Sequence, residues 1–98
     1  LLQALMAGNG VWLKPGRDST ECAQALRMLW IEAGGPPDLI EVLPEEVDAV
    51  SGALEAGVEH VVLTGSTTSG RAVLRLAAET ITPTTMELSG CDAVIVQG

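Results

Sequence analysis

Strand-like and helix-like segments alternate along most of the 98-residue chain, and this alternation constrains the fold more than any other feature. Short apolar runs typical of strands lie at residues 10–15, 38–44 and 60–65, and each is followed by apolar residues at helical spacing. Two further strand-like runs, 84–88 and 93–97, end the series. Alternating strands and helices form right-handed βαβ units with parallel strands. The pattern predicts an α/β, Rossmann-like fold with a mainly parallel, doubly wound sheet in the order βαβαβαββ.

The segment from Arg17 to Gly35 carries the clearest helix signals of the chain. Asp18, followed three residues later by Glu21, resembles a capping box. Apolar residues recur at helical spacing and predict one buried face, formed by Cys22, Ala25, Leu26, Leu29 and Ala33. The sequence Gly-Gly-Pro-Pro then ends the helix. Cys22 is therefore expected to be a buried structural residue.

Three further helical patterns complete the series. One covers the first residues and ends at Gly8, the next ends at Gly57, and another opens at Ser66. The side chains expected to face inward from the last two are Val47, Val50 and Leu54, and then Val73, Leu76 and Ala77.

Composition excludes several classes of function. The net charge of −8 and the presence of only two aromatic residues argue against a nucleic-acid partner, and the charge also argues against an anionic membrane surface. Two cysteines far apart in sequence indicate a reduced, cytoplasmic protein rather than a disulfide scaffold. No combination of His, Cys and carboxylate has metal-ligand spacing, so no metal site is predicted.

The two ends of the sequence suggest an internal piece of a larger protein. The chain opens without Met, as if inside an amphipathic helix, and it ends directly after a strand-like run. Strands that are apolar on both faces also need more cover than a short chain supplies. We therefore expect an incomplete domain.

Polar features follow several of the expected strands. Lys14 comes after the first strand, the segment 64–66 after the third, and Glu87 late in the fourth. Ligands of open parallel sheets lie outside the carboxyl ends of the strands. If the strands run parallel, these three features share one rim of the sheet.

The turn from Gly65 to Gly70 has the chemistry of an anion site. Glycine lets the backbone approach a ligand, and the following helix N-terminus attracts negative charge. The turn is not a P-loop, because Arg71 and Ala72 replace the required Lys and Ser or Thr. It also lacks the middle glycine of the dinucleotide fingerprint, where Thr67 stands. A simple Ser/Thr helix cap is the alternative interpretation.

The isolated charged residues allow two interpretations each. Lys14 is either a ligand-binding cation or a solvated surface lysine. Glu87 lies between Met86 and Leu88, and a carboxylate in such a setting suits a general base, but an edge-strand glutamate that points into water fits the local sequence equally well. His60 has no assigned role.

Three segments together resemble a known family. "AGNGVWLKPGRDST", "VVLTGSTTSGRAV" and "MELSGCDAVIV", in this order and spacing, are similar to the cofactor-binding domain of the aldehyde dehydrogenase superfamily. The resemblance covers essentially the whole chain and implies that residues 1–98 are a partial NAD(P)-binding domain.

The resemblance implies a role for each matching residue. Lys14 would contact the adenosine ribose of NAD or NADP, and Gly65 and Ser66 would meet the pyrophosphate. Gly70 would allow close packing of the helix, and the backbone at Leu88 would lie near the nicotinamide carboxamide.

The resemblance also implies a reaction. In this family a cysteine thiolate attacks the aldehyde, hydride passes to NAD(P)+, and the thioester is hydrolysed to a carboxylic acid. Glu87 would be the general base that activates the hydrolytic water. The nucleophilic cysteine is expected beyond Gly98 and the oxyanion-hole asparagine before Leu1, so the chain alone is expected to be inactive. The parent enzyme is expected to be a homo-oligomer that acts on an aldehyde.

Several positions depart from the family pattern. Ser89 and Cys91 replace a glycine and a lysine after the glutamate, and Cys91 is expected to be a small buried residue rather than a nucleophile. Glu45 and Glu46 make a poor neighbour for phosphate near the adenine. Arg17 stands where the family often has a glutamate, so it either binds the 2′-phosphate of NADP, which would then be tolerated, or faces solvent.

Two other functions remain open from sequence. A CoA-acylating relative with the same fold is one, although such relatives often lack the general-base glutamate that Glu87 matches. The other is a non-catalytic, truncated or degenerate nucleotide-binding or assembly module, which the departures at Ser89 and Cys91 would suit.

Overall fold

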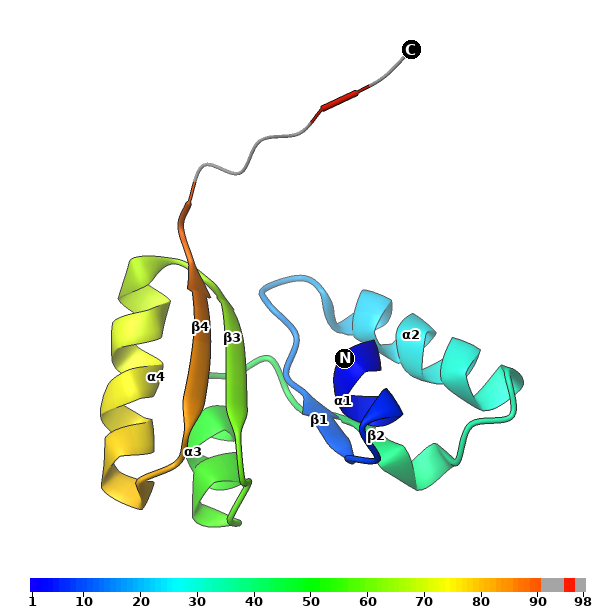
Figure 1. Cartoon of the computed structure of the whole chain (residues 1–98), viewed down its shortest axis with the longest axis horizontal. Helices are drawn as coiled ribbons and strands as arrows, with labels where there is room; N and C mark the ends of the chain where they lie inside the picture. The colour runs from blue at the N-terminus through cyan, green and yellow to red at the C-terminus, as the bar shows by residue number, and fades with distance from the viewer. Residues whose placement is uncertain (91–94, 97–98) are drawn as a thin grey trace. The chain divides into compact units, whose positions relative to one another are not determined.

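The computed structural model describes residues 1–90 and 95–96, and the chain divides into two compact units, Leu1–Val50 and Ser51–Gly98. Each unit holds one two-stranded parallel sheet, β1 with β2 and β3 with β4 (Figure 1). The α/β class and the parallel strand direction are therefore confirmed. The strand pairing that the structure describes lies within each unit, β1 beside β2 and β3 beside β4.

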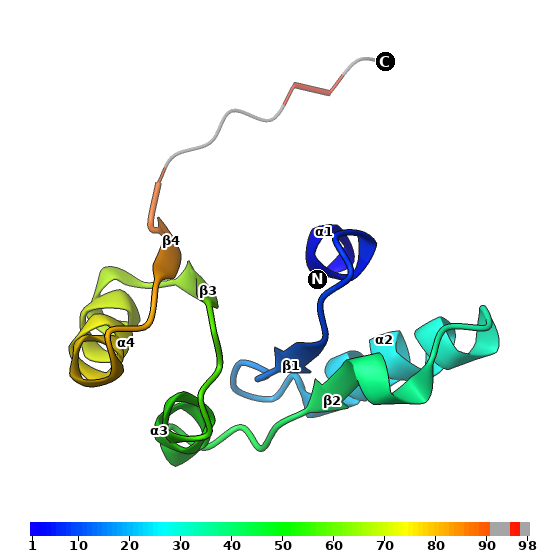
Figure 2. The same ribbon diagram turned by 60° about the horizontal axis from the view of Figure 1, so that its bottom comes forward.

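The first unit places a long helix along a short parallel ladder. Its elements are α1 (Leu2–Met6), β1 (Val11–Leu13), α2 (Thr20–Glu32), the 3-10 turn η1 (Pro37–Leu39) and β2 (Ile40–Val42). Val11 lies opposite Ile40 in the ladder, and Leu43 N–H extends the pairing by donating to the Leu13 carbonyl at 3.0 Å. Figure 2 shows α2 running beside β2. Ile40, only 2% exposed, is the centre of the core in this unit.

The buried face of α2 differs from the predicted one. Ala23 is the buried residue of this helix, whereas all five residues of the predicted apolar face are exposed: Cys22, Ala25, Leu26, Leu29 and Ala33. The rotation of the helix follows from two side chains that bind backbone carbonyls. Arg27 Nε donates to the Ile40 carbonyl at 2.9 Å, and Trp30 Nε1 donates to the Pro36 carbonyl at 2.8 Å.

The capping box predicted from Asp18 and Glu21 does not form. Ser19 is the N-cap, and its own side chain does not bond the first turn. Asp18 takes a left-handed conformation with φ 57°. The first N–H groups instead donate to Glu45, which lies 25 to 27 residues away in sequence. Such a long-range partner leaves no local signal.

The second unit contains a complete βαβ motif. Its elements are β3 (Val61–Gly65), α4 (Thr67–Thr80) and β4 (Thr84–Leu88). Helix α4 opens after Ser66 as predicted, and its Val73 and Ala77 are buried with Leu76 half-buried, so the predicted inward face is confirmed. In the register, Val61 pairs with Thr84 at one end.

The remaining predicted elements have mixed outcomes. Helix α3 (Asp48–Glu55) buries Leu54 and half-buries Val50, but Val47 precedes the helix and is 69% exposed. The strand predicted over 93–97 falls mostly outside the described residues, as does Cys91, and the described Ile95 and Val96 belong to no strand. Within the described part of the chain, no helix is both long and apolar enough to cross a membrane.

Candidate functional site

The carboxyl ends of β3 and β4 lie side by side. Their parallel register places Thr64 opposite Glu87 and Gly65 opposite Leu88 (Figure 1). The glycine turn and the glutamate therefore meet at one edge of this sheet, as the sequence predicted. Ligands of parallel sheets bind at this kind of edge.

Ser66 closes the turn as the N-cap of α4. Its Oγ accepts the N–H of Ser69 at 3.1 Å and lies 3.0 Å from the Ser69 hydroxyl. The interpretation of this serine as a helix cap is therefore confirmed. A cap satisfies only part of the first turn, so the N-terminus of a helix such as α4 keeps free N–H groups and a positive dipole end for an anion.

Gly65 leaves space beside the turn. A Cβ added at this position would have Ser69 Cβ at 3.9 Å as its nearest neighbour, an ordinary van der Waals contact, and the residue is exposed. The protein itself therefore does not require glycine here for packing. A pyrophosphate can approach the backbone closely where no side chain blocks it and a helix N-terminus follows.

Gly70 brings α4 close to β4. A Cβ at this buried position would lie 2.6 and 2.7 Å from the Leu88 Cδ atoms and 3.2 Å from Cγ. The absence of a side chain thus makes room for Leu88, which packs under the helix. Glu87, the preceding residue, is exposed because side chains alternate between the two faces of a strand.

Two polar contacts join distant residues of this unit, one at the carboxyl ends of the strands and one near their amino ends. Thr67 Oγ1 lies 3.2 Å from the Ser89 hydroxyl, and His60 Nε2 lies 2.9 Å from Thr85 Oγ1. Neither contact is predicted by the sequence, because the partners lie 22 and 25 residues apart and neither pair forms a motif. The first contact ties the turn to the end of β4, so Ser89 supports the edge although it departs from the family pattern.

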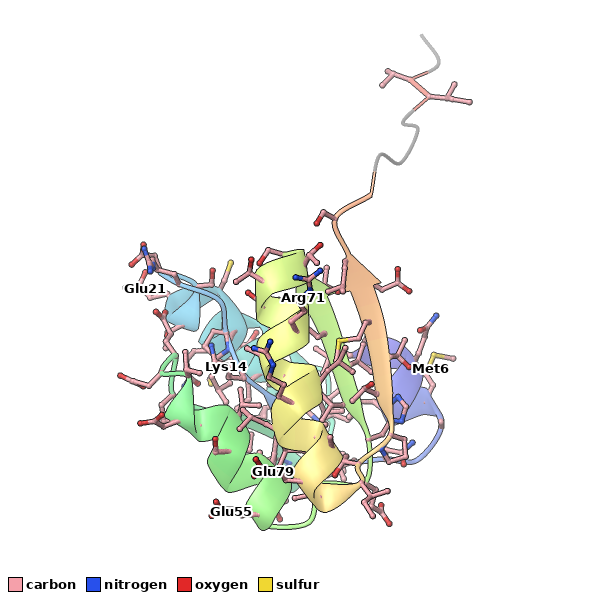
Figure 3. The ribbon with its side chains drawn as sticks, turned by 90° about the vertical axis from the view of Figure 1, so that its left-hand side faces the viewer. Met6, Lys14, Glu21, Glu55, Arg71 and Glu79 are labelled. Carbon is pink, nitrogen blue, oxygen red and sulfur yellow. The ribbon has the colours of Figure 1, made fainter. Side chains whose placement is uncertain are left out.

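Lys14 and Arg17 belong to the first unit. Lys14 is half-buried, and its Nζ donates to the neighbouring Pro15 carbonyl at 2.7 Å. Figure 3 labels this side chain. Arg17 is exposed. Since the two units are described separately, the predicted convergence of Lys14 with the glycine turn stays a prediction.

Glu45 forms the densest polar cluster of the first unit. Its carboxylate accepts the N–H groups of Asp18, Ser19 and Thr20 at 3.0, 3.0 and 3.1 Å. It also accepts the Thr20 hydroxyl at 2.6 Å. The Thr20 hydroxyl, followed by the Asp18 N–H, lowers the pKa of Glu45 below its ordinary value of 4.5. From the sequence, this residue was expected only to be a poor neighbour for phosphate.

The described residues contain no group of three or more His, Cys, Asp or Glu side chains placed to hold a metal ion. The chemistry available at the β3–β4 edge is therefore that of hydroxyls, backbone N–H groups and one carboxylate. These groups can hold an anion and move a proton.

A parallel βαβ unit with a glycine turn at its carboxyl edge is the building block of Rossmann-like α/β folds. Comparison with known proteins gives the family. The model of the aldehyde dehydrogenase family matches residues 1–98, and the chain belongs to this family.

Curated relatives agree with this assignment. The chain is 42% identical over 95 residues to 3,6-anhydro-alpha-L-galactose dehydrogenase of Streptomyces coelicolor, a match that covers 95% of this chain and 19% of the relative. It is 41% identical over 95 residues to betaine aldehyde dehydrogenase of Cereibacter sphaeroides, covering 95% and 20%. It is 37% identical over 90 residues to the dimeric NADP-preferring aldehyde dehydrogenase of Mus musculus, covering 92% and 20%.

The fold agrees as well. The substrate-bound state of Staphylococcus aureus AldH matches with a TM-score of 0.71 and 28% identity, over 89% of this chain and 19% of that one. The chain thus spans about a fifth of the length of the relatives it matches.

Proposed function

We propose that this chain is part of the NAD(P)-binding domain of an enzyme that oxidises an aldehyde to a carboxylic acid. The observation that carries the proposal is the register that sets Gly65 and its helix-capping neighbour beside Glu87 and Leu88. Family membership and the names of the relatives, all of them dehydrogenases and one NADP-preferring, support it.

The donors at the β3–β4 edge fit a dinucleotide. The pyrophosphate is held against Gly65 and Ser66, where the backbone is open and a helix begins. The backbone of Leu88 faces the nicotinamide carboxamide. Lys14 and Arg17 supply positive charge for the adenosine ribose end. When bound, NAD or NADP accepts the hydride from the substrate.

Glu87 is proposed as the general base. Its carboxylate is exposed at the same sheet edge and free to take a proton from the water that hydrolyses the thioester. The cysteine that carries the thioester is expected outside these residues, because Cys22 lies on the exposed side of α2 and Cys91 is too close in sequence to Glu87.

A matched pair of glycine variants tests the cofactor site. Gly65→Ala places its methyl group in ordinary van der Waals contact with Ser69 Cβ at 3.9 Å, so the fold is retained while the pyrophosphate loses its close approach. The affinity of the full-length protein for NAD and NADP, measured by titration calorimetry, is expected to fall about tenfold. Gly52→Ala in α3, where an added Cβ has no neighbour within 4 Å, is the control and is expected to leave both affinities unchanged. A folded Gly65→Ala protein with native affinity would refute the cofactor site.

A further inference from the structure

Glu45 brings a fixed negative charge to the loop that carries Arg17. Its carboxylate accepts four hydrogen bonds from three consecutive residues, which begin directly after that arginine. Glu45 is therefore held in place, although it lies on an exposed loop. Three N–H groups at the start of α2, those of Asp18, Ser19 and Thr20, are engaged by this side chain.

The electrostatic consequence concerns an added phosphate near Arg17. The guanidinium attracts such a group, whereas the carboxylate of Glu45 repels it and already accepts the N–H groups of Asp18, Ser19 and Thr20. Glu46, the next residue, is also acidic but makes no hydrogen bond to α2 among the contacts of the described residues. The two neighbouring glutamates thus differ in whether they are held against the Arg17 loop.

We propose that Glu45 is a coenzyme-selecting residue, which disfavours the 2′-phosphate of NADP near Arg17 and shifts the preference toward NAD. This inference rests on the proposed function, which places the adenosine ribose beside Lys14 and Arg17. The two side chains act in opposite directions, since Arg17 favours the 2′-phosphate and Glu45 opposes it. The start of α2 is filled by Glu45 and is itself no ligand site.

Charge removal at Glu45 is the test. Dissociation constants for NAD and NADP are measured by titration calorimetry on the full-length protein and its Glu45→Gln variant. The isosteric amide removes the charge, and NADP is expected to bind about fivefold more tightly, the size of effect that one charge has at a helix N-terminus. NAD affinity is expected to change by less than about twofold. Glu46→Gln is the matched control and is expected to leave the ratio of the two constants unchanged.

A second variant separates charge from helix capping. If Glu45→Gln fails to fold, the double variant Ser19→Asn with Glu45→Gln supplies a neutral N-cap and is expected to show the same gain for NADP. An unchanged ratio of the NAD and NADP constants in the folded variant, or an equal shift in Glu46→Gln, would overturn the inference. If the unmodified protein bound neither NAD nor NADP, the proposed function would be refuted instead.

Discussion

Ile81 ends α4 in a conformation that suits glycine better. Its φ of 55° and ψ of 35° lie in the left-handed region, and its side chain is 87% exposed. This conformation costs a β-branched residue about 1 to 2 kcal/mol, and burial of the side chain offsets little of that cost here. The position is a site of strain without compensating contacts.

Ile81→Gly is therefore expected to stabilise the protein. The relief of backbone strain is partly offset by the larger freedom of glycine in the unfolded chain, which leaves a net gain of about 0.5 to 1 kcal/mol. Thermal denaturation measures it as a rise in Tm. Ile81→Val, which keeps the branched side chain, is expected to show no rise, and a drop in Tm for the glycine variant would contradict the account.

Gly70 and Leu88 form a pair that can be tested by a double-mutant cycle. Gly70→Ala pushes a methyl group into the Leu88 side chain and is expected to cost about 1 to 3 kcal/mol of unfolding free energy. In the background of Leu88→Ala the same change becomes harmless, because alanine is a better helix former than glycine. Chemical denaturation of the four proteins measures the coupling, and additive effects would show that the close approach is unimportant.

Glu87→Gln tests the proposed general base. The amide cannot accept the proton from water, so turnover of an aldehyde by the full-length enzyme is expected to fall by about 10²- to 10⁴-fold. NAD affinity is expected to be unchanged, because Glu87 is exposed and does not pack against α4. Glu79→Gln on α4 (Figure 3) is a control of the same chemistry away from the edge. Full activity in Glu87→Gln would remove this residue from the mechanism.

At the scale of elements, local signals determine what the sequence can predict. The strand, glycine turn and helix around Gly65 are contiguous, so the sequence predicts both the βαβ motif and the meeting of Gly65 with Glu87. The rotation of α2 was not predicted, because it depends on Arg27 and Trp30 binding carbonyls of a later segment. The capping of α2 by Glu45 was missed for the same reason.

The cap of α2 makes the stability of this helix depend on pH. Hydrogen bonds from Thr20 and its neighbours lower the pKa of Glu45 from 4.5, so the folded state binds its proton less readily than the unfolded state. The stabilisation is fully present above the unfolded value of about 4.5 and is lost as pH falls through the lower folded value. At neutral pH the Tm of the unmodified protein is expected to be higher than that of Glu45→Gln. This difference is expected to shrink below pH 4.5. A difference that is independent of pH would contradict the cap.

At the scale of the whole molecule, the apolar surface is large for the core that the chain builds. Within the described residues, the buried apolar side chains are Leu5, Ala23, Ile40, Leu54, Val73 and Ala77. Of the residues at 1–90 and 95–96, thirteen large hydrophobic ones are exposed, among them Leu29 and Val62. A chain of this size buries a smaller share of its surface than a full domain does, and the relatives are about five times longer. The sequence patterns do not predict which of the short strands pair with each other, because that pairing depends on surroundings that local patterns do not describe.

The 98 residues alone are expected to bind NAD or NADP weakly and to oxidise no aldehyde. The chain spans about a fifth of the length of its relatives, so part of the nicotinamide site is expected outside these residues. A catalytic cysteine is also expected only outside this chain. Titration calorimetry and the formation of reduced coenzyme with an aldehyde, each measured on the chain and on the full-length protein, check both points. Aldehyde oxidation by the chain alone would show that one of its own cysteines is the nucleophile. The proposal that Glu87 activates water for a thioester on a cysteine outside this chain would then be wrong.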